Sequence, residues 1–220
     1  MVSLLAMSGK KAKPANLREA CIREALSIIE RSGVEELSLR EVARRLGVSH
    51  QAPYKHFPSR DHILAEIAAR AFESFAQYLD ARPQTGDPDA DLGEMGVAYL
   101  GYAQAHPLQY RLMFGTPLPD PRKHPEMMKK ARHAFSLLRD GLRRLPSKRQ
   151  GPKHQGPELE TEILQDALFI WSTLHGLASL SGSSVLRTLD LPPDLHENAI
   201  SYTLLRIGTG IGKKATELKG

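Results

Sequence analysis

Cysteine, long apolar stretches and metal-binding clusters are scarce or missing in this sequence. Cys21 is the only cysteine among 220 residues, so the chain cannot form an internal disulfide and a reducing compartment is expected. No apolar run approaches the ~18–20 residues that cross a bilayer. The nine histidines are dispersed, without the His-x-x-x-His pair or acidic cluster that would indicate a metal site. We therefore expect no membrane span, no metal and no cofactor.

The sequence also lacks the arrangements that enzymes use. No glycine-rich phosphate loop is present, and Cys21 has no His or Asp at a fixed local spacing. An all-α enzyme is therefore a remote alternative, and we name no catalytic residue. At the N-terminus a short apolar stretch precedes Lys10, Lys11 and Lys13, the reverse of the order in a secretory signal. We expect a cytoplasmic protein.

Charge is unevenly distributed along the chain. The net charge is +5, and residues 1–62 hold 11 Lys/Arg against 7 Asp/Glu, whereas residues 63–220 hold 19 against 18. A basic module on a nearly neutral body suits binding of a polyanion through one end. The same excess can also be an ordinary solvated surface.

The hydrophobic pattern is helical throughout, and no segment alternates as a strand does. Asn16 with Glu19 and Ser38 with Glu41 have the spacing of two capping boxes, and Gly33 is expected to end the first helix in a left-handed conformation. We predict an all-α protein of about nine helices, at 16–32, 38–47, 49–57, from 59 to about 80, 90–106, 107–115, 124–145, 159–182 and 194–208. Residues 146–157, which lack apolar periodicity, are expected to form a flexible loop.

The stretch from Ser38 to Phe57 has the spacing of a helix-turn-helix. Ala43 is small where two steeply crossing helices approach, Gly47 tolerates the positive φ of the turn, and Val48 fills the junction beneath them. Each feature is common alone, but their combination at this spacing favours a DNA-binding motif. A plain helix–loop–helix core element is the alternative.

The second helix of this motif would lie in the major groove. Gln51 can pair with an adenine edge, and Lys55 can reach a guanine or a phosphate. Pro53 would lie in the first turn of a helix capped by Ser49, where a missing N–H costs little. His56 could instead pack beside Phe57. The candidate DNA contacts, to phosphates or to bases, are Ser38, Arg40, Ser49, His50, Gln51, Ala52, Tyr54, Lys55, His56 and Arg60.

Residues 16–65 resemble the DNA-binding domain of the TetR family of transcriptional regulators. Pro53 departs from the family pattern, in which an aliphatic residue is commoner. Farther along, the Trp-x-x-x-His-Gly pattern of Trp171, His175 and Gly176 resembles a Trp-His-Gly subgroup of the same family. The matching positions in the DNA-binding stretch are Ala43, Leu46-Gly47-Val48-Ser49, Tyr54, His56-Phe57 and Arg60.

The resemblance implies a division of the chain into parts. It implies a flexible basic tail at 1–15, a helix-turn-helix domain at 16–62, an effector-binding and dimerisation domain at 63–210 and a tail at 211–220. It also implies a homodimer that binds double-stranded, pseudo-palindromic operator DNA, with the last two long helices pairing across a twofold axis. The interface candidates are Leu164, Leu168, Gly176, Ile200, Leu204 and Ile207.

The middle helices carry methionines and aromatic residues that suit an adaptable apolar pocket. We predict a repressor released by a small, mostly apolar effector with one or two polar groups. The same residues could equally form a tight core, which would leave a regulator without a small-molecule effector, constitutive or controlled by a partner protein. The candidate effector contacts are Met95, Tyr99, Tyr102, His106, Met113, Phe114, Met127, Phe135, Trp171 and His175.

Overall fold

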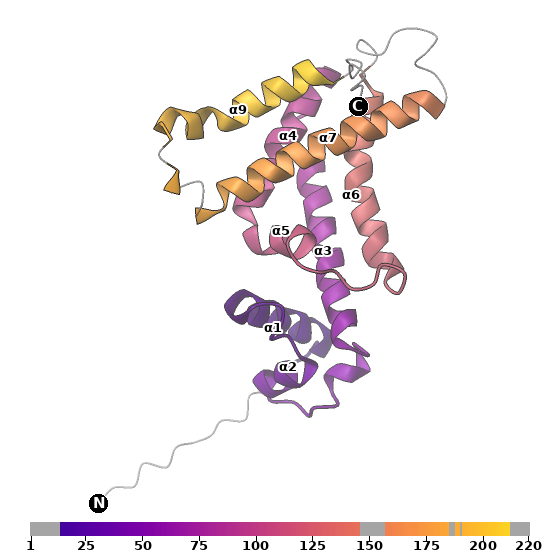
Figure 1. Ribbon diagram of the computed structural model, residues 1–220. Helices are drawn as coiled ribbons and strands as arrows, with labels where there is room; N and C mark the ends of the chain where they lie inside the picture. The colour runs from indigo at the N-terminus through magenta and orange to yellow at the C-terminus, as the bar shows by residue number, and fades with distance from the viewer. Residues whose placement is uncertain (1–13, 146–156, 185–187, 190, 212–220) are drawn as a thin grey trace, which may run out of the picture. The chain divides into compact units, whose positions relative to one another are not determined.

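The computed structural model describes residues 14–145, 157–184, 188–189 and 191–211. Every regular element in these ranges is helical, which confirms the all-α class (Figure 1). None of these helices is long and apolar enough to span a membrane. The predicted tails at 1–15 and 211–220 and the predicted loop at 146–157 fall almost entirely outside the described residues. The elements are α1 (Leu17–Ser32), α2 (Leu39–Leu46), the 3-10 turn η1 (Pro53–Lys55), α3 (Arg60–Asp80), α4 (Pro88–Ala105), α5 (Pro107–Phe114), α6 (Pro125–Arg143), α7 (Pro157–Ser181) and α9 (Pro193–Gly210).

Local sequence sets the ends of the first two helices. Asn16 accepts a hydrogen bond from the N–H of Glu19 (3.1 Å) and Ser38 accepts one from Glu41 (3.2 Å), which confirms both predicted N-caps. The return bond of a capping box is not formed in either case, because the carboxylates of Glu19 and Glu41 pair with arginines. Gly33 after α1 has the expected positive φ of 92°, but its ψ of 164° lies outside the left-handed helical region.

The first compact unit comprises residues 14–71 and 111–128. In Figure 1, α1 and α2 lie beside the first turns of α3. Residues 111–128, expected in the C-terminal domain, belong to this unit, where Met127 packs against Ala65 and Ala68 of α3. The remaining core is apolar side chains from α1, α2 and α3, with Ile28, Val42 and Ile63 almost fully buried. Burial of these faces supplies most of the stabilisation.

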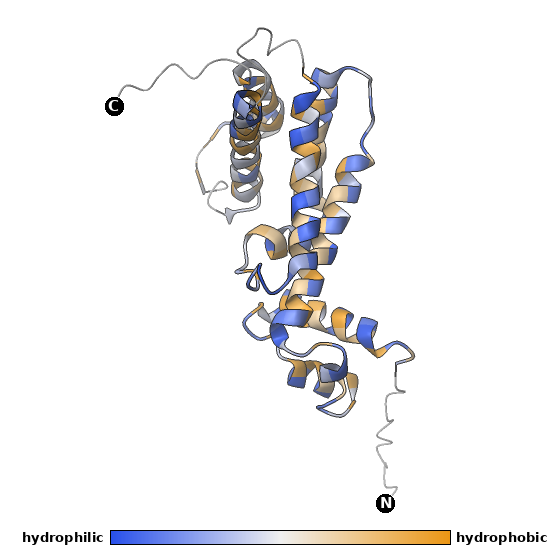
Figure 2. Ribbon diagram, turned by 90° about the vertical axis from the view of Figure 1, so that its right-hand side faces the viewer, coloured by the Kyte–Doolittle hydropathy of each residue, from blue (hydrophilic) through white to orange (hydrophobic). Residues whose placement is uncertain are grey.

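The second compact unit comprises residues 72–110 and 129–211. Within it α4, α7 and α9 contact one another, and Figure 2 shows hydrophobic residues recurring along these helices. Leu204 of α9 packs closely over Gly96 of α4, so a Cβ at this position would require the leucine side chain to shift. The buried residues of α7 are Ile163, Ala167, Ile170 and Leu174.

Candidate nucleic-acid interface

Helix α2 is anchored through one face and ends in a tight turn. Leu39, Val42 and Ala43 are buried, as expected for the inner face. Gly47 has φ 67° and ψ 29°, the left-handed conformation predicted for it, and the N–H of Val48 bonds to the carbonyl of Ala43 (3.1 Å). A residue with a Cβ would destabilise this turn.

The segment after this turn differs from the predicted α-helix capped by Ser49. Residues 50–52 form a turn and Pro53–Lys55 form one turn of 3-10 helix. In an α-helix capped by Ser49, the N–H of residue 53 would bond to the Ser49 carbonyl, but proline has no N–H. The Ser49 carbonyl instead accepts the N–H of Ala52 at 2.9 Å. The proline is almost fully buried and thereby fixes the turn in place.

The turn exposes most of the side chains predicted to contact DNA. Tyr54 is 40% exposed, Ala52 is half-buried, and the other predicted residues from Ser49 to His56 are exposed. A surface groove of about 640 Å³ is lined by side chains from α2 and from the turn. The residue from α2 lies ten or more positions before those of the turn, so the fold brings them together. Its lining residues are Arg40, His50, Gln51 and Tyr54.

The cations on this surface fall into two classes. The Arg44 guanidinium donates to both oxygens of Glu41 (2.7 Å each) and Arg45 Nε donates to Glu41 Oε1 (2.7 Å). These bonds hold the pKa of Glu41 at about 2. Its carboxylate therefore stays ionised at neutral pH and offsets the positive charges of Arg44 and Arg45. Arg40 and Lys55 form no ion pair with a described residue, so both can pair with phosphates.

Two of the predicted phosphate contacts also have structural roles. Arg60, at the start of α3, donates to the carbonyls of Val34 (2.6 Å) and Leu37 (3.0 Å), which ties α3 to the segment before α2. Its side chain is still 40% exposed. Ser38 caps α2 through its hydroxyl and is exposed. The sequence pattern did not indicate the role of Arg60, because its partners are backbone carbonyls more than 20 positions away.

Known protein families match both parts of the chain. Residues 22–67 match the family described as bacterial regulatory proteins, tetR family, and residues 92–201 match the family described as tetracyclin repressor-like, C-terminal domain. The chain belongs to the TetR family. It is a DNA-binding transcriptional regulator of the helix-turn-helix type.

Individual relatives agree with this assignment. An uncharacterised HTH-type transcriptional regulator of Mycobacterium tuberculosis is 25% identical over 206 residues, which cover 93% of this chain and 86% of the relative. The tetracycline repressor protein class C of Escherichia coli is 43% identical over 51 residues, 23% of each chain. The crystal structure of the regulatory protein SCO4313 has a TM-score of 0.70 and 25% identity, covering 87% of this chain and 94% of that chain. The Trp-His-Gly subgroup stays a prediction.

The predicted effector contacts of this TetR-family chain divide between the two units. Met113, Phe114 and Met127 lie in the first unit, and the others lie in the second. In the second unit Met95, Tyr99 and Tyr102 are almost fully buried, with exposures of 5%, 6% and 0%. The remaining members, His106, Phe135, Trp171 and His175, are half-buried.

Several of these side chains bond to one another. The hydroxyls of Tyr99 and Tyr110 lie 3.0 Å apart, and the Tyr110 hydroxyl lies 2.7 Å from Nδ1 of His175. Trp171 donates its indole N–H to Tyr99. Burial raises the pKa of Tyr99 well above its usual range, so this phenol stays protonated. The Trp and His of the pattern noted in the sequence therefore form part of one polar network.

A cavity of about 180 Å³ lies elsewhere in the second unit, between α4, the start of α5, α7 and α9. None of the predicted effector contacts lines it. Its wall is apolar except for Gln104 and Ser181. Ile200, predicted at the dimer interface, is one of its lining residues. The apolar lining residues are Leu100, Ala103, Pro107, Leu177, Ala178, Gly182 and Ile200.

The predicted interface residues are placed in different environments. Leu164 and Leu168 of α7 are 46% and 59% exposed, whereas Ile207 of α9 is 5% exposed and is covered by its own unit. Leu204 packs over Gly96, and Gly176 has open space where a Cβ would lie. The periodicity of α9 showed an apolar face, but it could not show that this face packs inward. The exposed large apolar residues of these helices include Leu164, Leu168, Phe169, Tyr202 and Leu205.

Proposed function

We propose that this protein binds a pseudo-palindromic operator as a homodimer and represses transcription until a small, mostly apolar effector binds. The groove formed by Arg40, His50, Gln51 and Tyr54 is the observation that carries the DNA-binding part. A cation, an amide, an imidazole and a phenol are presented together there, with no acidic side chain in the lining. This is the chemistry that reads base edges and holds phosphates.

The exposed apolar surface of α7 and α9 supports the homodimer. Leu168 is 59% exposed, and Tyr202 and Leu205 are 64% and 63% exposed. Apolar side chains concentrated on paired helices mark an interaction surface when no described residue covers them. A second copy related by a twofold axis would bury the same residues from both sides and match the symmetry of a palindromic site.

The cavity in the second unit supports the effector. It is lined mostly by apolar groups, and Gln104 and Ser181 offer an amide and a hydroxyl to a polar group of the ligand. A volume of about 180 Å³ suits a small molecule or part of a larger one. A ligand that fits one conformation better would shift the separation of the DNA-reading units.

The hydrogen-bond network favours a second candidate, a regulator of the same fold without a small-molecule effector. Tyr99, Tyr110 and His175 already satisfy one another, so these polar groups need no ligand. The protein would then act constitutively or under the control of a partner protein.

DNA binding is tested by selecting duplexes from a randomised library and measuring affinities by fluorescence anisotropy. Gln51→Ala should relax preference at one base pair, at a cost of about 1–3 kcal/mol for the preferred duplex. Arg40→Ala should weaken all duplexes alike. The matched control is Lys129→Ala, which removes an exposed cation of α6. The absence of selectable DNA for a folded wild-type protein would contradict the proposal.

Effector binding is tested by screening apolar small molecules for both a thermal shift and release of the selected duplex. Ala103→Phe should abolish the response to a hit, because the ring fills the cavity that Ala103 lines. Ala105→Phe is the control, since Ala105 is exposed on the same helix outside the lining. If no compound releases DNA, the effector-free candidate takes precedence. If both variants respond to a hit as wild type does, the effector binds outside this cavity.

A further inference from the structure

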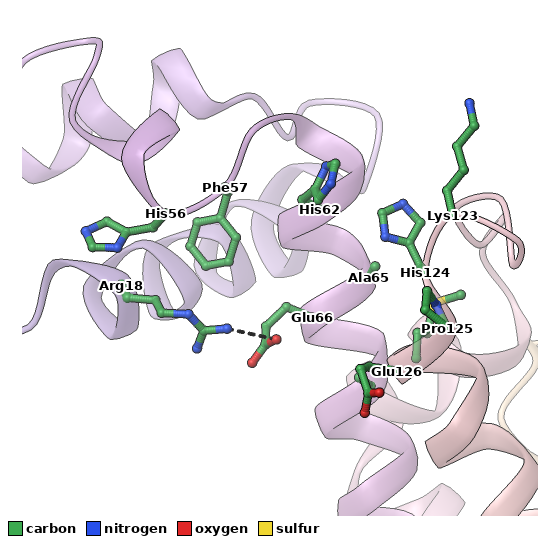
Figure 3. Close-up of a pocket in the computed structure, with 12 residues that line it drawn as sticks. Arg18, His56, Phe57, His62, Ala65, Glu66, Lys123, His124, Pro125 and Glu126 are labelled. Atoms are coloured by element: carbon green, nitrogen blue, oxygen red, sulfur yellow. Dashed lines mark ion pairs between the residues drawn. The ribbon is translucent and has the colours of Figure 1, made fainter.

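The first unit contains a second cavity that shares no lining residue with the DNA-facing groove. Its volume is about 270 Å³, and its walls come from α1, the residues after η1, α3 and the start of α6 (Figure 3). The polar lining comprises His56, His62 and His124, an arginine and a lysine, and two glutamates. None of these residues except His56 belongs to the predicted DNA or effector contacts.

His124 is a largely buried residue of this cavity whose ring nitrogens remain accessible from the cavity. It is 9% exposed, and its ring forms no hydrogen bond with a described residue; its ring contact is with His62, edge to face at 5.0 Å between centroids. Nδ1 of His62 is hydrogen-bonded to the hydroxyl of Ser59 (2.9 Å), so Nε2 is available to bind a ligand. Figure 3 shows the two rings turned toward each other at the cavity. Buried imidazoles normally have a hydrogen-bond partner, so a ligand in the cavity would complete this site.

The lining holds two acids and two cations, but these four groups differ in how far they are already engaged. Both oxygens of Glu66 are engaged, one by Arg18 (2.9 Å) and one by Arg70 (2.8 Å). Burial opposes its charge, but these bonds outweigh burial and keep the pKa of Glu66 below its usual value. Lys123 forms no ion pair with a described residue. The nearby Asp120 carboxylate interacts electrostatically with Lys123 and His124, but it is bonded to Arg122. Glu126 is the remaining acid of the lining, and it is exposed in the first turn of α6.

The start of α6 adds backbone donors to the same wall. The first backbone bond of this helix runs from the N–H of Met128 to the carbonyl of His124 (3.3 Å). The N–H groups of Glu126 and Met127 precede it and have no partner four residues earlier in the helix. A helix N-terminus with free N–H groups attracts negative charge, and here it adjoins the imidazole of His124.

We propose that this cavity binds a small molecule through an anionic group, a carboxylate or a phosphate-like oxyanion. His62, His124 and Lys123 hold the anionic group together with the first N–H groups of α6. Phe57 and Ala69 contact the rest of the molecule. The occupant also touches His56 and Phe57, which directly follow the 3-10 turn, so the site shares the predicted DNA contact His56 with the proposed DNA-binding surface.

The test uses the full-length protein with its histidines isotopically labelled, and sodium sulfate or sodium benzoate as the probe. Each probe is titrated against sodium chloride at matched ionic strength, and the ring signals of His62 and His124 are followed by NMR. We expect a saturable shift of both signals with at least one probe and no comparable shift with chloride. Tighter binding of benzoate would show that the apolar wall contributes, and sulfate alone would show that the anionic group suffices.

Variants connect the signal to the site. His62→Asn changes an exposed residue and should weaken binding at least tenfold, and His124→Asn should do the same if the protein folds. Glu126→Gln should tighten binding severalfold, because it removes the remaining acid. His133→Asn, at an exposed histidine of α6 outside the cavity, is the control and should have no effect. Absence of a saturable shift with both probes, or equal weakening by His62→Asn and His133→Asn, overturns the proposal.

Discussion

The two units of the chain use their polar side chains in opposite ways. In the first unit the side chains of Arg40, Gln51 and Lys55 are exposed and form no hydrogen bond or ion pair with a described residue. In the second unit Tyr99 and Tyr110 are buried and bonded to each other, and several large apolar side chains of α7 and α9 are left exposed. The first unit thus presents polar groups to a charged partner, whereas the second presents an apolar surface.

This difference shows which functional residues a linear pattern can identify. Outward residues on a short, anchored turn follow from the position of the turn, which Ala43 and Gly47 mark in the sequence. A buried residue becomes a ligand contact only if its neighbours leave space and free polar atoms. That condition depends on side chains from several helices at once, so spacing along one helix does not reveal it.

Charged substitutions on α9 test the apolar surface, with the largest expected effect. Ile207→Asp should unfold the second unit, because an unpaired buried charge costs about 3–5 kcal/mol. Leu205→Asp, at a side chain 63% exposed, should keep the fold and produce monomers with weakened operator binding. Thermal melts and sedimentation equilibrium separate the two outcomes. A stable Leu205→Asp dimer would place the interface elsewhere.

Removing one hydroxyl tests the buried polar network. Tyr110→Phe removes the hydroxyl that bonds to Tyr99 and to His175 Nδ1, and a lost intramolecular hydrogen bond costs about 0.5–1.5 kcal/mol. Urea unfolding should show the loss. Tyr78→Phe is the control, because Tyr78 is 39% exposed. Equal unfolding free energies for the two variants would mean that the hydrogen-bond network does not stabilise the second unit.

Salt dependence tests the free cations of the first unit. Lys55→Ala should weaken binding to every duplex and flatten the slope of log affinity against log salt by about 0.9, the contribution of one phosphate contact. Anisotropy titrations between low and high salt measure this slope, with Lys129→Ala as the control. An unchanged slope would mean that Lys55 contacts no phosphate.

The ion pairs of Glu41 give the smallest effect. The pKa of Glu41 in the folded protein is about 2, below its value of about 4.3 in an unfolded chain. Its pairing therefore stabilises the fold above about pH 4.3, and this contribution is lost as the pH falls toward 2. Glu41→Gln should lower the Tm slightly at pH 7, less so in high salt, and the difference from wild type should shrink in acid. A pH-independent difference would contradict this origin.

The sequence predicted most of the fold. Periodicity placed every described α-helix to within a few residues, since each buries one apolar face, and Asn16 and Ser38 marked helix starts through bonds to residues three positions away. For the short element after Gly47, the sequence predicts an α-helix, and this prediction is wrong. The sequence allows Pro53 in the first turn of an α-helix. In the structure, its missing N–H and its burial instead produce a 3-10 turn.

For the sites, the sequence by itself determined the position of the turn that is predicted to contact DNA, because its residues lie close together in the chain. The features that define this turn, a small residue, a glycine and a cap, act over a few positions. Only the tertiary structure decided which side of α9 faces inward, which tyrosines bond to His175, and where the cavities lie. Those outcomes depend on contacts between residues such as Tyr110 and His175, 65 positions apart. The packing of several helices determines these outcomes, and no single stretch of sequence encodes that packing.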